Sequence, residues 1–145
     1  MKTRNILALL LCFIAILVTA QKKINTSELP SGANEFLAKH FNGIAIDKAK
    51  KDAEHGEKGF EVILVDGTEI EFWKDGTYRE VDGKGIAIPT DFIDSKIVAY
   101  VKKNYPNNPI THIDYGHKDV DVDLTDKIDL EFSKEGIFIK KGGKH

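Results

Sequence analysis

The sequence predicts an α+β fold, built as a tandem duplication of a helix followed by a four-stranded antiparallel sheet. Residues 70–78 and 130–138 share one pattern: an apolar residue, an acid and phenylalanine, then a polar step to glycine and an aromatic residue. A stretch with helical spacing precedes each copy, and alternating strands with Gly turns surround it. We therefore expect repeats at 29–83 and 88–141, joined by a linker at 84–87. Their helices should cover one face of the sheets and leave the other face open to solvent.

Residues 1–20 have the features of a Sec signal peptide. A basic start is followed by an uncharged apolar run at 6–18 and by small residues before Gln21, where the mature chain would begin. This run is shorter than the roughly twenty residues that span a bilayer, which disfavours the alternative of a membrane anchor. Lipidation at Cys12 is a further alternative, disfavoured because the residue before it is not small. We expect a periplasmic or secreted protein with no membrane contact after cleavage.

The mature chain would be acidic and free of thiols. Cleavage removes two of the 21 basic residues and none of the 23 acidic residues. An acidic chain without a basic stripe is not expected to bind nucleic acid. Cleavage also removes Cys12, the one cysteine. Disulfides, a cysteine nucleophile and a cysteine-based zinc site are thereby excluded.

The first repeat should follow a polar, aperiodic leader at residues 21–28. Apolar residues at helical spacing predict a short helix between Leu29-Pro30 and Asn42-Gly43, where glycine can end it. Strands are expected after the helix at 44–54, 60–65, 68–73 and 77–82.

The length of the first hairpin loop decides which side chains share a face. A three-residue loop closed by Gly67 in a left-handed conformation pairs Val62 with Ile70 and gathers the apolar residues. A two-residue loop would instead pair Val62 with Glu71 and mix the two faces. The same three-residue loop, closed by Gly76, is expected in the next hairpin.

The second repeat follows the same order. Ile93, Ile97 and Val101 form an apolar stripe that predicts its helix. Its strands are expected at 110–115, 120–124, 128–132 and 137–140, followed by a tail at 142–145.

This ordered combination of motifs resembles the PepSY-like family of exported bacterial proteins, which is similar in fold to beta-lactamase inhibitory protein. The matching features are the signal peptide, the helix openings Leu29-Pro30 and Ile88-Pro89, and the hairpins with Asp-Gly turns over 60–78. The resemblance covers residues 30–141 and implies a duplicated helix-on-sheet fold in a periplasmic or extracellular protein. It implies no settled activity, and inhibitor-like binding rests on analogy of fold alone. The second repeat departs from this pattern at Asp126-Lys127, where lysine replaces the turn glycine. We therefore expect this turn to differ from the one at Asp66-Gly67.

An acidic ladder in the second repeat raises the alternative of a cation- or small-ligand-binding protein. Alternating acids open calcium loops when the backbone curls around the ion. Here apolar residues fill the alternate positions and no glycine follows, which is typical of a half-buried strand with a solvated face. We assign no metal ligand to the ladder, which consists of Asp119, Asp121, Asp123, Asp129 and Glu131.

No motif of an enzyme is evident. The mature chain has no nucleophile elbow, no phosphate loop and no zinc-binding helix motif. We predict no catalytic residue and no cofactor, and keep an enzyme of unrecognised type as a third alternative. The histidines show no spacing suited to zinc: His40, His55, His112, His117 and His145.

The outward face of the first repeat carries the clearest candidate for binding. An indole beside aliphatic residues, ringed by acids, is typical of an anchor for a protein partner. The alternative is that the indole packs against the second repeat or a loop. The candidate protein-binding residues are Trp73, Ile63, Val65, Glu61, Glu69 and Glu71.

The sequence therefore predicts an exported, non-catalytic binding module. We expect it to recognise another exported protein through the open sheet face, as an inhibitor or a chaperone. The identity of that partner and the oligomeric state have no signature in the sequence.

Overall fold

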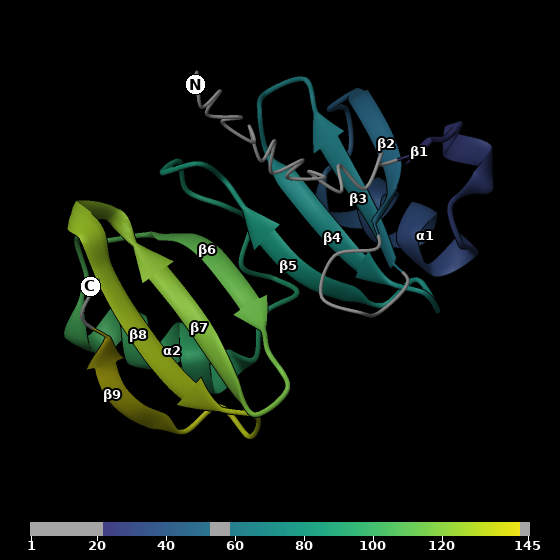
Figure 1. The fold of residues 1–145 in the computed structure, drawn as a ribbon. Helices are drawn as coiled ribbons and strands as arrows, with labels where there is room; N and C mark the ends of the chain where they lie inside the picture. Colours follow the sequence, from purple (N-terminus) through teal and green to yellow (C-terminus); the bar gives the residue numbers. More distant parts are fainter. Residues whose placement is uncertain (1–21, 53–58, 143–145) are drawn as a thin grey trace, which may run out of the picture.

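The computed structural model describes residues 22–52 and 59–142. The predicted signal peptide, Cys12, His55 and the end of the predicted tail lie outside the described residues. The described chain forms one antiparallel sheet with the strands in chain order (Figure 1). The strands are β1 (Lys22–Lys23), β2 (Ile46–Asp52), β3 (Gly59–Leu64), β4 (Glu69–Trp73), β5 (Tyr78–Asp82), β6 (Ile110–Tyr115), β7 (Asp119–Leu124), β8 (Ile128–Ser133) and β9 (Phe138–Gly142). The helices are α1 (Ser31–His40), α2 (Ser95–Asn104) and the short 3-10 helices η1 (Thr26–Glu28) and η3 (Thr125–Lys127).

The predicted α+β class is confirmed, and the sheet is more continuous than expected. The sequence suggested two adjoining sheets, but β5 pairs with β6 and merges them. We call β1 to β5 with α1 the first half, and α2 with β6 to β9 the second half. Each of the two longer helices precedes four strands in the chain.

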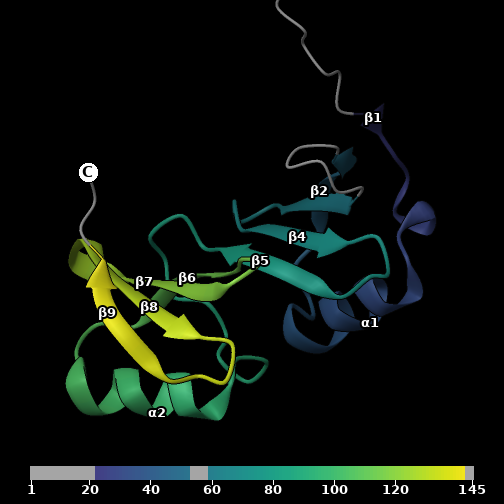
Figure 2. The ribbon, with the colours of Figure 1, turned by 60° about the horizontal axis from the view of Figure 1, so that its bottom comes forward.

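One row of directly opposed residues explains why the sheet buries a single face. Because neighbouring strands keep this register, the apolar side chains point the same way from β2 to β8. Each residue in the row is at most 3% exposed. Figure 2 shows α1 and α2 on the same side of the sheet, below β4 and β5 and below β7 to β9 respectively. The row consists of Ala49, Val62, Ile70, Val81, Ile113, Val122 and Leu130.

Matching groups of three aromatic rings join each helix to its strands. In the first half, Phe36 of α1 stacks on Tyr78, with ring centroids 4.8 Å apart, and meets Phe72 edge-on at 83°. In the second half, Tyr100 of α2 stacks on Phe138, with ring centroids 4.5 Å apart, and meets Phe132 edge-on at 86°. Such offset and edge-on contacts add stability beyond the area that they bury. The second group is Tyr100, Phe138 and Phe132.

The predicted three-residue loops are confirmed. Val62 pairs with Ile70, and the glycines that close the two loops, Gly67 and Gly76, have φ of +91° and +88°. The turn between β7 and β8 differs, as its sequence indicated. There Asp126 and Lys127 adopt positive φ without a glycine.

The predicted leader contributes to the fold. Lys22 and Lys23 form β1 and pair with β2, and Ile24 is buried against the core at 6% exposure. The polar composition of 21–28 concealed this contact, because one apolar residue does not create a periodic pattern. Gly142, placed in the predicted tail, is the last residue of β9.

Candidate functional site

The open face of the sheet is crossed by a row of acidic residues. The register that aligns the buried row also aligns the residues between them on the opposite face. Six acids stand next to one another across six strands, with a lysine at each end. The row is Lys50, Glu61, Glu71, Glu80, Asp114, Asp121, Glu131 and Lys140.

Arg79 offsets part of the negative charge at the centre of this row. It is the extra residue of a bulge in β5, between Tyr78, which pairs with Phe72, and Glu80. Its guanidinium contacts Glu71, lies 2.9 Å from Glu80 and lies 3.4 Å from Asp114 on β6. Burial opposes the charge, but these carboxylates outweigh it and raise the pKa of Arg79. The guanidinium of Arg79 therefore links the two halves, because Glu71 and Glu80 belong to the first half and Asp114 belongs to the second.

The strand register separates the predicted protein-binding residues into two places. Glu61 lies opposite Glu71, but Trp73 lies opposite Gly59 and Ile63 lies opposite Glu69. Gly59 and Ile63 are four positions apart in β3, or about 13 Å along the strand. Val65 follows β3 at the far end and is 63% exposed. The indole is therefore not beside Ile63 and Val65 as the sequence suggested.

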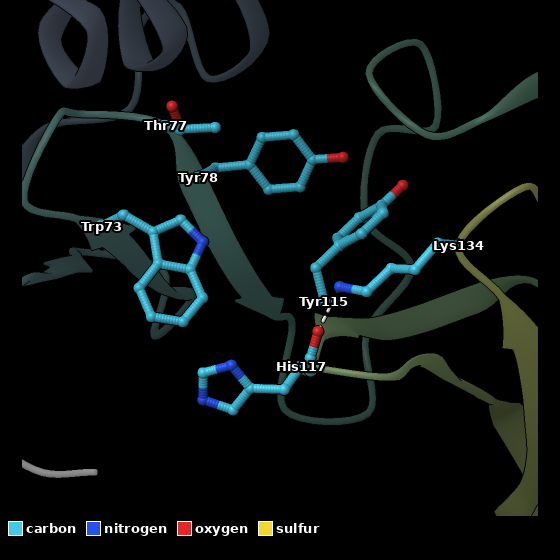
Figure 3. A pocket seen from close by; sticks show the side chains of 7 residues that line it. Trp73, Thr77, Tyr78, Tyr115, His117 and Lys134 are labelled. Carbon is cyan, nitrogen blue, oxygen red and sulfur yellow. Dashed lines mark hydrogen bonds between the residues drawn. The ribbon is translucent and has the colours of Figure 1, made fainter. Parts of the chain in front are cut away.

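A cavity of about 460 Å³ lies beside Trp73, where β5 and β6 diverge. The two strands pair only from Glu80 to Asp82, so beyond them the chain leaves an opening. Figure 3 shows Trp73 on one side of this opening and side chains of the second half on the other. The lining residues are Trp73, Thr77, Tyr78, Tyr115, Gly116, His117 and Lys134.

Trp73 is half-buried and contacts both halves. The guanidinium carbon of Arg79 lies 5.6 Å from the centre of the indole, within the range of a cation–π contact. The ring of His117, in the turn after β6, lies 6.2 Å from the indole. The sequence gives no sign that Tyr115 and Lys134 belong to this site, because only the pairing of β5 with β6 brings them into the same cavity lining as Trp73.

The comparisons with known proteins agree with this architecture. A family model described as "Putative beta-lactamase-inhibitor-like, PepSY-like" matches residues 58–140. This chain belongs to the PepSY-like family. A search of the curated proteins finds no match.

Three solved structures of similar proteins come from Bacteroides species. One is a "putative calcium-regulated periplasmic protein" from Bacteroides thetaiotaomicron, with 31% identity and a TM-score of 0.80, covering 85% of this chain and 97% of that chain. Another is a "putative periplasmic protein" from Bacteroides vulgatus, with 28% identity and a TM-score of 0.81, covering 87% and 99%. A third, also from Bacteroides vulgatus and of unknown function, has 27% identity and a TM-score of 0.78, covering 84% and 100%.

In this PepSY-like chain, His112 of β6 forms a second charged link between the halves. Its Nε2 lies 2.9 Å from Glu80 and its Nδ1 lies 3.4 Å from Asp123. Burial alone would lower the pKa of His112, but the hydrogen bonds and charges of Asp123 and Glu80 raise it to about 10. The hydrogen bond from His112 in turn lowers the pKa of Glu80. The imidazole is therefore a cation at neutral pH.

His112→Gln should change how stability depends on pH. A histidine whose folded-state pKa lies above its unfolded value of 6.5 stabilises fully below that value, and loses the effect as pH rises through about 10. We expect the variant to lose about 1–3 kcal/mol of unfolding free energy at pH 6, and much less at pH 10. Urea unfolding at pH 6, 8 and 10 measures the difference, with His117→Gln as the control. A loss that stays constant with pH would contradict a charged imidazole.

The acids of the second half are crowded. Burial and the charges of Asp119, Glu131, Asp114 and Asp123 raise the pKa of Asp121. No group of three or more His, Cys, Asp or Glu residues within 22–52 and 59–142 is arranged to hold a metal ion. The acidic strands of this PepSY-like chain therefore carry like charges held close together rather than a formed metal site.

Proposed function

We propose that this PepSY-like protein is an exported binding module with no catalysis of its own. It recognises another exported protein through the open face of its sheet, as an inhibitor or a chaperone. The observation that carries this proposal is the one-sided fold, because both helices cover the same face and the opposite face has no covering element among the described residues. A sheet face presented in this way offers a broad, preformed surface to a partner.

Export is supported by two independent observations. The first twenty residues have the pattern of a cleavable signal peptide. The similar proteins of known structure are described as periplasmic. No helix in the described parts of the chain is long and apolar enough to cross a membrane.

The chemistry of the open face indicates what kind of partner it suits. Acidic side chains dominate the row that crosses all the central strands. A basic patch on the partner would complement them and speed the encounter. The half-buried indole of Trp73 beside its cavity would then supply an apolar anchor, the type of contact that carries most binding energy in protein interfaces.

Trp73→Ala should weaken partner capture while the protein stays folded. The mature chain from Gln21, immobilised, is exposed to a periplasmic extract of the bacterium that produces it, and retained proteins are identified. We expect the variant to retain at least tenfold less of the main partner, since central anchors contribute about 2 kcal/mol or more. Ile86→Ala is the control, because Ile86 is 67% exposed and lies in the linker between the halves.

Two results would count against the proposal. If Trp73→Ala captures the partner as well as the unaltered protein does, the indole is not an anchor. If the variant loses its cooperative thermal transition, Trp73 serves the fold instead. Circular dichroism of the same samples separates these results.

A second candidate function is cation binding by the acidic second half. It is favoured by the crowding that raises the pKa of Asp121, and by the relative described as "calcium-regulated". A divalent cation would relieve the repulsion and stabilise the folded state by mass action. Calcium should then raise the Tm of the mature chain, and a chelator should reverse the rise. An unchanged Tm at millimolar calcium would remove this candidate.

A further inference from the structure

The cavity beside Trp73 has aromatic walls held in fixed positions. The Tyr78 hydroxyl donates to the carbonyl oxygen of Phe92 at 3.1 Å, which fixes that ring. The Tyr115 ring meets Tyr78 edge-on at 90°, with the centroids 5.4 Å apart. Figure 3 shows the Trp73 indole across the opening from Tyr115, with its nitrogen turned toward the two tyrosines. A volume of about 460 Å³ is sufficient for a single aromatic ring with a short substituent.

The charge of this cavity is opposite to that of the sheet face beside it. None of its lining residues is an acid, and Lys134 supplies an ammonium group. Lys134 Nζ donates to the carbonyl oxygen of Gly116 and lies 5.9 Å from the centre of the Tyr115 ring. An ammonium group has three donors, so this bond leaves it able to donate to a ligand.

Two acids of the sheet face beside the cavity share a cation. Glu71 and Glu80 contact the Arg79 guanidinium, which is only 12% exposed. The guanidinium offsets part of their charge on the sheet side, and Lys134 places a positive charge in the lining of the cavity itself. A neutral or cationic aromatic ligand would bring that ammonium no opposite charge in addition to its hydrogen bond with the Gly116 carbonyl oxygen.

We infer that this cavity binds an aromatic ring that carries a carboxylate, with the ring against Trp73 and Tyr115 and the carboxylate on Lys134. The C-terminal aromatic residue of a polypeptide has this chemistry, and so does a free aromatic acid. The inference deepens the proposed function, because it names the group that a partner would place beside Trp73.

Trp73 itself provides the measurement, since it is the only tryptophan of the chain. Its fluorescence is followed while the mature protein is titrated with the tripeptide Ala-Ala-Phe, its C-terminal amide, 3-phenylpropanoate and phenethylamine. We expect saturable changes with the two carboxylates, about tenfold weaker binding of the amide, and weaker binding still of the amine. Tighter binding of the tripeptide than of 3-phenylpropanoate identifies a polypeptide end as the source, and the reverse order identifies a free aromatic acid.

Lys134→Gln tests the role of the ammonium without altering the indole. It should weaken both carboxylates about tenfold and bring their affinity to that of the amide. Lys103→Gln is the matched control, because it removes the same charge from an exposed position on α2. Equal affinity for the carboxylate and the amide, or no spectral change with any of the four probes, would overturn the inference. Neither of these results would affect the proposed function, which depends on partner capture by the open face and not on Lys134.

Discussion

Gly76→Ala is expected to lower the free energy of unfolding by about 3 kcal/mol. Gly76 closes the hairpin between β4 and β5 with a φ of +88°, a conformation that costs other residues about 1–3 kcal/mol. An added Cβ would also lie 2.9 Å from the Cβ of Pro30 and 3.0 Å from the backbone nitrogen of Ala33. The hairpin would have to move away from the start of α1, which adds an overpacking cost of about 1 kcal/mol or more.

Gly67→Ala is the matched control for this prediction. Gly67 closes the equivalent loop between β3 and β4 with a φ of +91°, but nothing lies within 4 Å of the Cβ that would be added. Gly67→Ala should therefore lower the free energy of unfolding by the backbone cost alone, about 1 kcal/mol less than Gly76→Ala does. Chemical denaturation of both variants gives the comparison. Equal losses would show that the contact between the turn and α1 contributes nothing.

Phe132→Ala should destabilise the protein by about 3–5 kcal/mol, the usual cost of removing a buried phenylalanine. Phe132 is 0% exposed and lies edge-on to both Tyr100 and Phe138. The ring belongs to the aromatic group that joins α2 to β8 and β9, so its removal leaves a cavity between them. Ile139→Ala, on the neighbouring strand and 50% exposed, should cost well under 1 kcal/mol.

Phe132→Ala also tests whether the two halves unfold together. Trp73 lies in the first half, whereas far-UV circular dichroism reports on both halves. Since Val81 and Ile113 pair across the junction and are both fully buried, we expect one cooperative transition. The Phe132→Ala midpoint should then fall equally by fluorescence and by circular dichroism. If the Trp73 signal keeps its original midpoint, the halves unfold independently.

Short-range features of the fold were predictable, because each depends on residues that are neighbours in the chain. The glycines at 67 and 76 determine the loop length, and alternation then places Val62 opposite Ile70. The buried and open faces of each hairpin follow from that register. The same local argument places Trp73 on the open face, where it lies.

The candidate site was predicted less completely than the fold. The sequence singled out Trp73, but it grouped the indole with Ile63 and Val65 through their shared face alone. A shared face does not give the distance along the strands, and the register places Ile63 at the other end of β3. The residues that do surround the indole, His117 and Lys134 among them, belong to turns of the second half.

By itself, the sequence determined the α+β class, the hairpin registers, the helix that precedes each set of strands, and the PepSY-like family. Only the tertiary structure decided that β5 pairs with β6, that six acids align across one face, and that a cavity opens beside Trp73. The physical reason is the range of the interactions. Turn geometry and side-chain alternation act over a few residues, whereas Val81 meets Ile113 only because burial beneath the two helices favours a single continuous sheet.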